Sequence, residues 1–295
     1  MDASYCFKYN EGDIVYSIVT PIFNQQDIIV RNLKSVLSHT QGSFEVILIL
    51  DYCFDKTERN LLDYLKTYKN DNKNLIQIKI FKSRKPIFET KCDNIGFRNS
   101  IGKYCLEIQS DMEMTEYGYN LHLTKPFKLL DNIIAVSGRG GHNFINHRQG
   151  RVGRLGPAIA IRKNWMRKLN ISKNKFYITQ TVMRGPLLFE RKKLKELNFL
   201  NEDDFFLAGD DHDLIARAYA EKGYICGYVP IDFNAPPKDG SDRKQAFYKR
   251  INPIAYAVNQ KERHKRRPNA ERARKNNFKK YERDMKSKKI SIIEM

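Results

Sequence analysis

The sequence predicts an α/β fold built on an open, mostly parallel sheet that is flanked by helices. Short, almost continuously apolar runs alternate with segments whose apolar residues recur at helical spacing. A strand, a helix and a second strand in the same sheet form a right-handed parallel crossover. Several of the runs end in proline, asparagine or an acidic residue, and such sheets bind their ligands beyond the carboxyl ends of the strands.

The individual elements follow in chain order. Strands are expected over residues 15–24, 44–50, 75–81 and 104–108. The helix after the first strand would bury Ile28, Ile29, Leu33, Val36 and Leu37. The helix after the second would start near the capping residues 55–58 and bury Leu61, Leu62, Leu65 and Tyr68. A third helix, over residues 93–103, leads into the fourth strand.

Two carboxylates, Asp111 and Glu113, follow that fourth strand. Because a strand points alternate side chains the same way, we expect both carboxylates to face one point in space. Such a pair suits Mg²⁺ or Mn²⁺ holding a diphosphate. Solvated turns also produce this spacing by chance, so the pair alone is weak evidence.

Four blocks in a fixed order make the interpretation more specific. They are residues 17–24, 46–51, 94–113 and 209–214. In these blocks the chain resembles the inverting family 2 glycosyltransferases, which have the Rossmann-like GT-A nucleotide-sugar-binding fold, over about residues 15–235. It departs from the family pattern at two places: Asp111-Met112-Glu113 stands for the usual D-x-D, and Asp210-Asp211 for the usual Glu-Asp pair.

The resemblance implies roles for particular residues. Asp51 would accept a hydrogen bond from the imide N–H of uracil, which favours a UDP-sugar donor. Asp111 and Glu113 would bind Mn²⁺ or Mg²⁺. For Arg98, a solvated helix arginine is an equal alternative. The donor-binding set that the resemblance implies is Thr20, Pro21, Phe23, Asp51, Asn94, Arg98 and Asp111. Arg243 and Lys244, which follow the last strand, are expected to close over the diphosphate.

The resemblance also implies the catalytic residues. Asp211 would be the general base that takes a proton from the acceptor hydroxyl, and Asp210 is the second choice. A helix from His212 to Gly223 would hold Asp211 at its N-terminus. The alternative is that either aspartate only caps this helix. Arg184 would contact the acceptor or, as the alternative, the donor. The acceptor is expected to be a hydroxyl of a glycan, a lipid-linked molecule or a protein.

Length and charge indicate one catalytic domain with an extension. In a chain of 295 residues we assign 1–240 to the GT-A domain, with a nucleotide half at about 13–114 and an acceptor half at about 115–240, and 241–295 to a basic C-terminal extension. Residues 261–289 hold 14 Lys or Arg and 4 acidic residues, a net +10 of the total +19. We expect an exposed or partly disordered helical arm that contacts anionic membranes, or simply a solvated tail.

Other observations concern location and alternative functions. The five cysteines are scattered, and neither a signal peptide nor an apolar run long enough to span a membrane is visible. A cytoplasmic, membrane-peripheral protein is therefore expected. Two other classes remain open: a protein that binds nucleic acid or membranes through its basic arm, and a sugar-phosphate nucleotidyltransferase. Specific nucleic-acid binding is not expected, and the glycine-rich loop of nucleotidyltransferases is missing after the first strand.

Overall fold

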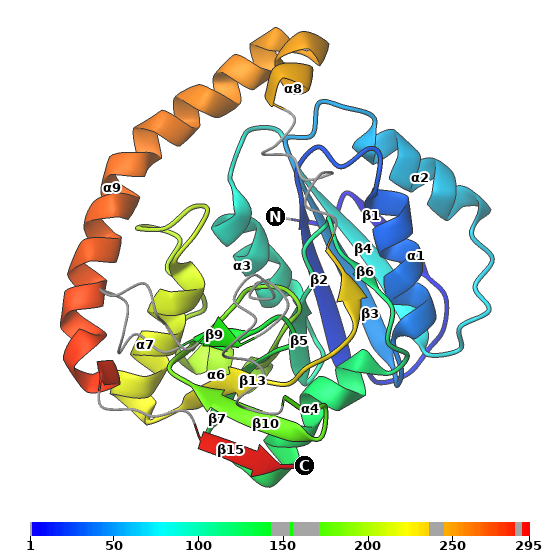
Figure 1. The fold of residues 1–295 in the computed structure, drawn as a ribbon. Coiled ribbons are helices and arrows are strands. Elements are labelled where there is room, and N and C mark those ends of the chain that lie inside the picture. The colour runs from blue at the N-terminus through cyan, green and yellow to red at the C-terminus, as the bar shows by residue number, and fades with distance from the viewer. Residues whose placement is uncertain (1, 143–153, 156–170, 236–244, 287–290) are drawn as a thin grey trace.

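One large sheet organises the molecule (Figure 1). The structure is a computed structural model that describes residues 2–142, 154–155, 171–235, 245–286 and 291–295. In the described part of the chain, ten strands form this sheet. In order across the sheet they are β1 (Tyr5–Lys8), β4 (Leu75–Ser83), β3 (Phe44–Asp51), β2 (Tyr16–Ile22), β5 (Tyr104–Glu107), β12 (Leu187–Glu190), β7 (Ile133–Ser137), β13 (Ile225–Tyr228), β10 (Lys175–Thr179) and β15 (Ser291–Glu294).

The predicted strands form the parallel half of this sheet. β2 pairs in parallel with both β3 and β5, and β3 pairs in parallel with β4. The connecting helices are α1 (Ile29–His39), α2 (Thr57–Thr67) and α3 (Glu89–Asn99). The prediction of an open α/β sheet is confirmed. The third helix begins and ends four residues earlier than expected. It ends before Gly102, where the chain lies against the backbone of β2.

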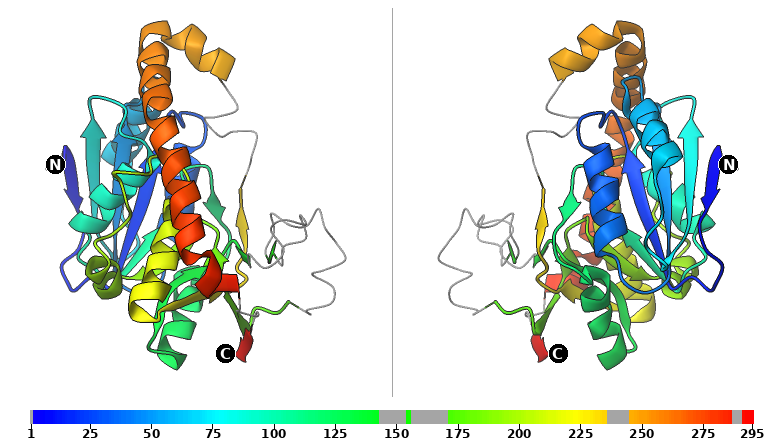
Figure 2. Two further views of the ribbon diagram at one scale, coloured as in Figure 1. Left: turned by 90° about the vertical axis from the view of Figure 1, so that its left-hand side faces the viewer. Right: turned by 90° about the vertical axis from the view of Figure 1, so that its right-hand side faces the viewer.

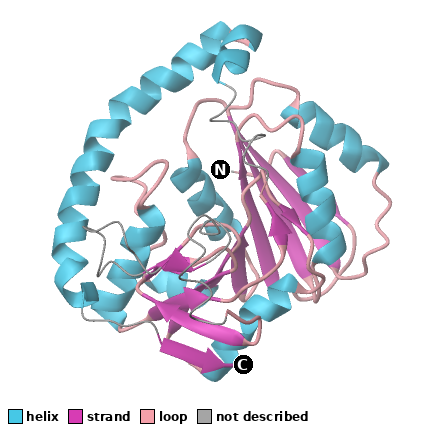
Figure 3. Ribbon diagram, in the orientation of Figure 1, coloured by secondary structure: helices cyan, strands magenta, loops and turns pink. Residues whose placement is uncertain are grey.

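Helices cover both faces of the sheet, and each face has its own apolar core (Figure 3). One core joins α1, α2 and α4 (Tyr119–Leu129) to the sheet, and the other joins α3, α6 (Arg191–Glu196) and α7 (Asp210–Lys222) to it. Every residue of β2 and of β3 is buried, as expected of strands covered on both sides. Gly96 lets α3 approach β2 closely, since a Cβ there would lie 2.2 Å from Val19.

The second half of the sheet is mixed. β12 runs antiparallel between β5 and β7, whereas β7 and β13 are parallel. Two small sheets lie beside it. One consists of β11 (Thr181–Val182), β8 (Gly141–His142) and β9 (Arg154–Leu155), and the other of β14 (Phe233–Asn234) and β6 (Glu113–Met114).

The C-terminal extension is helical, as predicted, but it is not detached from the domain. It forms α8 (Gln245–Ile251) and the long α9 (Pro253–Lys286), which packs along α7 on the outside of the molecule (Figures 1 and 2). Its inward side buries Ala255, Asn259 and Ala273. Beyond it, β15 pairs with β10 and completes the large sheet. Small side chains allow this close packing, so a low apolar content does not make the extension a free arm.

The described helices include none with the length and apolar character needed to cross a bilayer.

Candidate active site

An aromatic cluster lies at the carboxyl ends of β2 and β3. Thr20 and Pro21 are buried in β2, and the half-buried Phe23 follows that strand. The Phe23 ring lies 5.7 Å from the ring of Phe54 and 6.4 Å from that of Tyr248, which belongs to α8. The Tyr248 hydroxyl donates to the Asn24 carbonyl at 2.5 Å. The C-terminal extension therefore forms part of the predicted nucleoside end of the site.

Asp51, the last residue of β3, holds the loop that precedes α3. Its two carboxylate oxygens accept the backbone N–H groups of Ile87 and Phe88 at 2.8 and 2.9 Å. Burial raises the pKa of Asp51 to about 6, and the two amide donors and Arg266 offset this only in part. A carboxylate has about four acceptor positions. Asp51 therefore retains acceptor positions for a further donor while it fixes the loop.

Asp111 and Glu113 do not extend β5. That strand ends at Glu107, Asp111 lies in a turn, and Glu113 belongs to β6. The argument from strand alternation was therefore wrong, although the turn still lies after β5. Glu113 pairs with Arg31 of α1 at 3.3 Å, and 24% of its side chain is exposed. The proposed metal-binding role of the two residues remains a prediction.

A buried arginine joins the elements beneath this edge of the sheet. The Arg184 guanidinium lies at 2.7 Å from Asp210, 3.1 Å from Glu89, 3.2 Å from Asp93 and 3.5 Å from Glu107. We call these five residues the Arg184 cluster. It links α3, β5 and α7 to the segment before β12. Arg184 is 9% exposed, much like Asp211, and its predicted contact with the acceptor remains a prediction.

The Arg184 cluster holds more carboxylates than its one guanidinium can neutralise. Burial is the largest cause that raises the pKa of Glu89, of Asp93 and, to about 8, of Glu107. Burial therefore favours the protonated form of these three carboxyl groups relative to solution. Carboxylate oxygens of Glu89, Asp93 and Glu107 lie within 4.8 Å of one another, close enough to hold a metal ion. The Arg184 guanidinium already supplies a cation there, so the cluster fits a second cation poorly.

The two aspartates at the start of α7 differ in their surroundings. Asp210 is fully buried and accepts a hydrogen bond from Arg184 Nη2 at 2.7 Å. Asp211 has 8% exposure and accepts the backbone N–H of His212 at 2.9 Å. Gly209 precedes them with φ +91°, a conformation that glycine adopts without strain. Asp211 is therefore the more exposed of the two aspartates, at 8% against 0% for Asp210.

Asn94 and Arg98 have partners on the segment before α7. Both amide atoms of Asn94 bond to the backbone of Leu200, at 2.8 and 3.0 Å. Arg98 pairs with Glu202 at 3.2 Å and lies over the Phe199 ring. Arg98 also lies near the end of α3, toward the amino edge of the parallel strands. These contacts favour a structural role over the predicted donor contact. Arg243 and Lys244 lie outside the described residues.

Sequence reasoning missed the contribution of α9. Arg266 donates to the Ile87 carbonyl at 3.2 Å and lies over the Phe88 ring at 5.5 Å, beside the loop that Asp51 holds. Arg274 donates to the Ala208 carbonyl at 3.2 Å, just before the aspartate pair. A cavity of about 390 Å³ lies between α9 and residues 206–208. No local pattern predicted that this basic helix would touch both loops.

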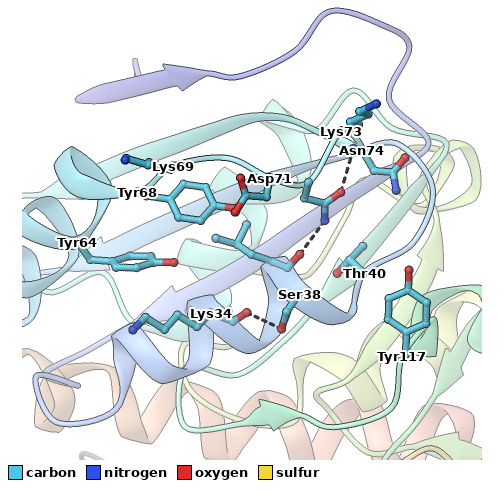
Figure 4. A pocket seen from close by; sticks show the side chains of 12 residues that line it. Lys34, Ser38, Thr40, Tyr64, Tyr68, Lys69, Asp71, Lys73, Asn74 and Tyr117 are labelled. Atoms are coloured by element: carbon cyan, nitrogen blue, oxygen red, sulfur yellow. Dashed lines mark hydrogen bonds between the residues drawn. The ribbon is translucent and has the colours of Figure 1, made fainter.

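A second cavity, of about 600 Å³, lies between α1, α2 and the loop after α2 (Figure 4). Tyr64, Tyr68 and Lys34 line it, and the Lys34 ammonium lies 5.2 Å from the centre of the Tyr64 ring. This loop leads into the amino end of β4. The cavity is therefore at the edge of the sheet opposite the acidic residues, and it is not part of the candidate site.

The fold and this acidic edge define an α/β protein of the GT-A type. The sequence model of glycosyl transferase family 2 matches residues 17–198, which is more than half of the 295 residues. The chain therefore belongs to glycosyl transferase family 2. No curated protein matches the chain.

Solved structures agree with this assignment at the level of the fold. The Pyrobaculum calidifontis mannosyltransferase PcManGT, in complex with GDP-Man and Mn²⁺, has a TM-score of 0.56 at 15% identity, over 84% of this chain and 70% of its own. GalNAc-T7 with UDP, GalNAc and Mn²⁺ has a TM-score of 0.55 at 16% identity, over 75% and 43%. S. aureus TarS has 0.52 at 15% identity, over 81% and 40%. The chain thus spans less than half of GalNAc-T7 and TarS.

Proposed function

We propose that this protein is a metal-dependent, inverting glycosyltransferase that moves a sugar from a nucleotide-diphosphate sugar to an acceptor hydroxyl. The observation that carries the proposal is the unequal pair at the start of α7 in a family 2 chain. Asp210 is buried against Arg184, and Asp211 beside it keeps accessible surface. A helix N-terminus also favours an anionic carboxylate.

In the proposed reaction Asp211 acts as the general base. Its carboxylate takes the proton of the acceptor hydroxyl while that oxygen bonds to the anomeric carbon. The bond between the anomeric carbon and the diphosphate oxygen breaks at the same time, and the nucleoside diphosphate leaves with the electron pair. Attack from the opposite side inverts the anomeric configuration. No covalent enzyme intermediate is required.

The donor is proposed to lie along the carboxyl ends of β2 and β3. Phe23 and Pro21 would flank the base, and Asp51 would accept from its imide N–H, which favours a UDP-sugar. The related structures contain UDP in GalNAc-T7 and GDP-Man in PcManGT, so relatives with this fold differ in the base they bind. The Asp51 carboxylate would accept the ring N–H of uracil, a donor that cytosine lacks, and this is the feature that favours a UDP-sugar over a cytidine donor in this proposal.

Asp111 and Glu113 are the proposed ligands of Mn²⁺ or Mg²⁺, because oxygen ligands suit both ions. When bound, the cation would stabilise negative charge on the leaving diphosphate. Glu113 would have to exchange its contact with Arg31, whose side chain is 55% exposed. GalNAc-T7 and PcManGT were solved with Mn²⁺.

The acceptor is proposed to be a hydroxyl of a glycan, a lipid-linked molecule or a protein. We also propose a cytoplasmic location, since all five cysteines are unpaired. Peripheral contact with an anionic membrane through residues 261–289 fits the charge of that segment, which is net +10 from 14 basic and 4 acidic residues.

A thermal-shift panel of nucleotide sugars with and without Mn²⁺ or Mg²⁺ tests the proposal. A ligand that binds only the native state raises its unfolding temperature, so we expect a UDP-sugar to give the largest shift, and to need the cation. Glu113→Ala should abolish the cation dependence, whereas Glu202→Ala, away from the turn, should not. If UDP and Mn²⁺ together shift the transition no more than either alone, the metal-diphosphate site is wrong.

A further inference from the structure

Three apolar side chains face solvent at the corner between α8 and α9. Ile251 is 40% exposed, Ile254 78% and Val258 38%. We call these residues the apolar tip. Ile254 and Val258 are four residues apart and therefore lie on one side of α9, and Ile251, the last residue of α8, precedes them at the corner. A single exposed isoleucine needs no explanation, whereas apolar side chains that gather at one exposed corner are typical of interaction surfaces.

The apolar tip is held outward by the rest of the corner. On the other side of the same segment, Tyr248, Ala255 and Asn259 are buried against the domain. Tyr248 is fixed further by its hydrogen bond to Asn24. The helix therefore cannot rotate to bury the tip without exposing these contacts. All three views show the corner of α8 and α9 at an extremity of the molecule, clear of the sheet (Figures 1 and 2).

Basic side chains continue the same surface. Lys249 and Arg250 precede the tip, and Lys261 and Lys265 follow Val258 at spacings of three and seven residues, so they extend its stripe along α9. All four are exposed. The surface thus has an apolar end at the corner and a cationic continuation along the helix.

We propose that this corner binds an anionic lipid bilayer, with the apolar tip in the interfacial region and the flanking Lys and Arg at the lipid phosphates. Interfacial helices combine these two features, and basic residues near the surface add attraction to anionic lipid. A nucleic acid would use the cations but gives no reason for an isoleucine that is 78% exposed. The bound orientation brings the carboxyl edge of β2 near the membrane, because Tyr248 of the same corner contacts that edge.

Cosedimentation with vesicles tests this proposal, with phosphatidylcholine alone and with added phosphatidylglycerol as the two lipid arms. We expect binding that needs the anionic lipid. Ile254→Ser should weaken vesicle binding about tenfold or more, because the substitution loses the free energy of burying an aliphatic side chain in the bilayer. The matched control is Ile101→Ser, at a 55% exposed isoleucine in the loop before β5, which should bind as the wild type does.

A double charge-reversal variant separates the electrostatic contribution to vesicle binding from the apolar one. Lys261→Glu with Lys265→Glu should weaken binding at low salt, whereas Lys125→Glu, at an exposed lysine on α4, should not. Unfolding temperatures of all variants identify any that fail to fold. Unchanged vesicle binding by a folded Ile254→Ser would overturn the proposal. A second result would also overturn it. If the wild type sediments as a dimer without lipid and Ile254→Ser sediments as a monomer, the apolar tip binds a second copy of the chain rather than a membrane. No nucleotide is present, so the result does not depend on the proposed glycosyltransfer.

Discussion

At the scale of single residues, one arginine gives two adjacent aspartates different properties. Arg184 contacts Asp210 at 2.7 Å and holds it in the interior, while Asp211 keeps 8% exposure one position later. Either residue could have been the base on sequence grounds, because both are adjacent carboxylates at the start of one helix. The helix begins at Asp210 rather than at His212, and its N-cap is Gly209, with no side-chain cap among the described residues, so the alternative that an aspartate only caps it is wrong. The geometry favours Asp211, since a base must reach the hydroxyl that it deprotonates.

We expect Arg184→Ala to destabilise the protein by about 3–5 kcal/mol, because it leaves buried carboxylates without their cation. The control is Arg98→Ala, whose pair with Glu202 is 41% exposed on the arginine side. An exposed pair contributes about 1 kcal/mol or less. Urea unfolding of both variants measures the difference. Equal losses would mean that the Arg184 cluster contributes no more than a surface ion pair.

Stability should fall as pH rises from about 4.5 to about 8. The pKa of Glu107 is raised from 4.5 to about 8, so across this range the native state keeps a proton that the unfolded chain has lost. The free energy of unfolding then decreases with increasing pH. Glu107→Gln has no proton to lose and should flatten this dependence. Urea unfolding at about pH 5 and about pH 8 measures it, and an unchanged slope would contradict the raised pKa.

At the scale of elements, α9 contacts two loops of the candidate site: the loop before α3, which we call the donor-side loop, and the loop before α7. Arg266 contacts the donor-side loop at Ile87 and Phe88, and Arg274 contacts Ala208 before the aspartate pair. Because Asp51 is held by the N–H groups of that same donor-side loop, α9 supports the predicted nucleoside pocket from outside.

Arg266→Ala should therefore weaken UDP binding about fivefold, the effect of losing one hydrogen bond and one cation–π contact that order the loop. Arg267→Ala is the matched control, since Arg267 is 69% exposed and pairs only with Glu271 of its own helix among the contacts described. Calorimetric titration with UDP and Mn²⁺ compares the two. Equal affinities would mean that α9 does not support the pocket.

The packing of the C-terminal extension could not be predicted from the sequence. The strands and helices over residues 15–108 were predicted because their apolar periodicity is strong. The inward side of α9 carries Ala255, Asn259 and Ala273 instead, which a hydrophobic pattern does not reveal. The pairing of β15 with β10 joins residues far apart in the chain.

A truncation after about residue 260 tests whether the extension is needed for stability and nucleotide binding. From composition alone such a truncation should leave nucleotide binding intact. The contacts of Arg266 and the loss of β15 from the sheet predict instead a lower unfolding temperature and weaker binding of UDP. Thermal unfolding and titration of the truncated chain distinguish these outcomes, and wild-type values for both would restore the expectation of a dispensable arm.

At the scale of the whole molecule, the site is assembled from segments that only the fold brings together. The strand ends and the aspartate pair were predictable from their motifs. The Arg184 cluster was not, because its members come from α3, β5, α7 and the segment before β12. A buried cluster of this kind has no local sequence pattern, and Asp111 and Glu113 likewise lie in a turn and a second small sheet that periodicity did not predict.

The central claim is that Asp211 is the base of a glycosyl transfer from a nucleotide sugar bound beside it. The most direct test follows the consumption of a UDP-sugar by NMR, with water or an added acceptor, and measures donor affinity in parallel. Asp211→Asn should bind the donor as the wild type does and lose about 10²–10⁴-fold in turnover. Wild-type turnover by Asp211→Asn, or an equal or greater loss confined to Asp210→Asn, would contradict the account.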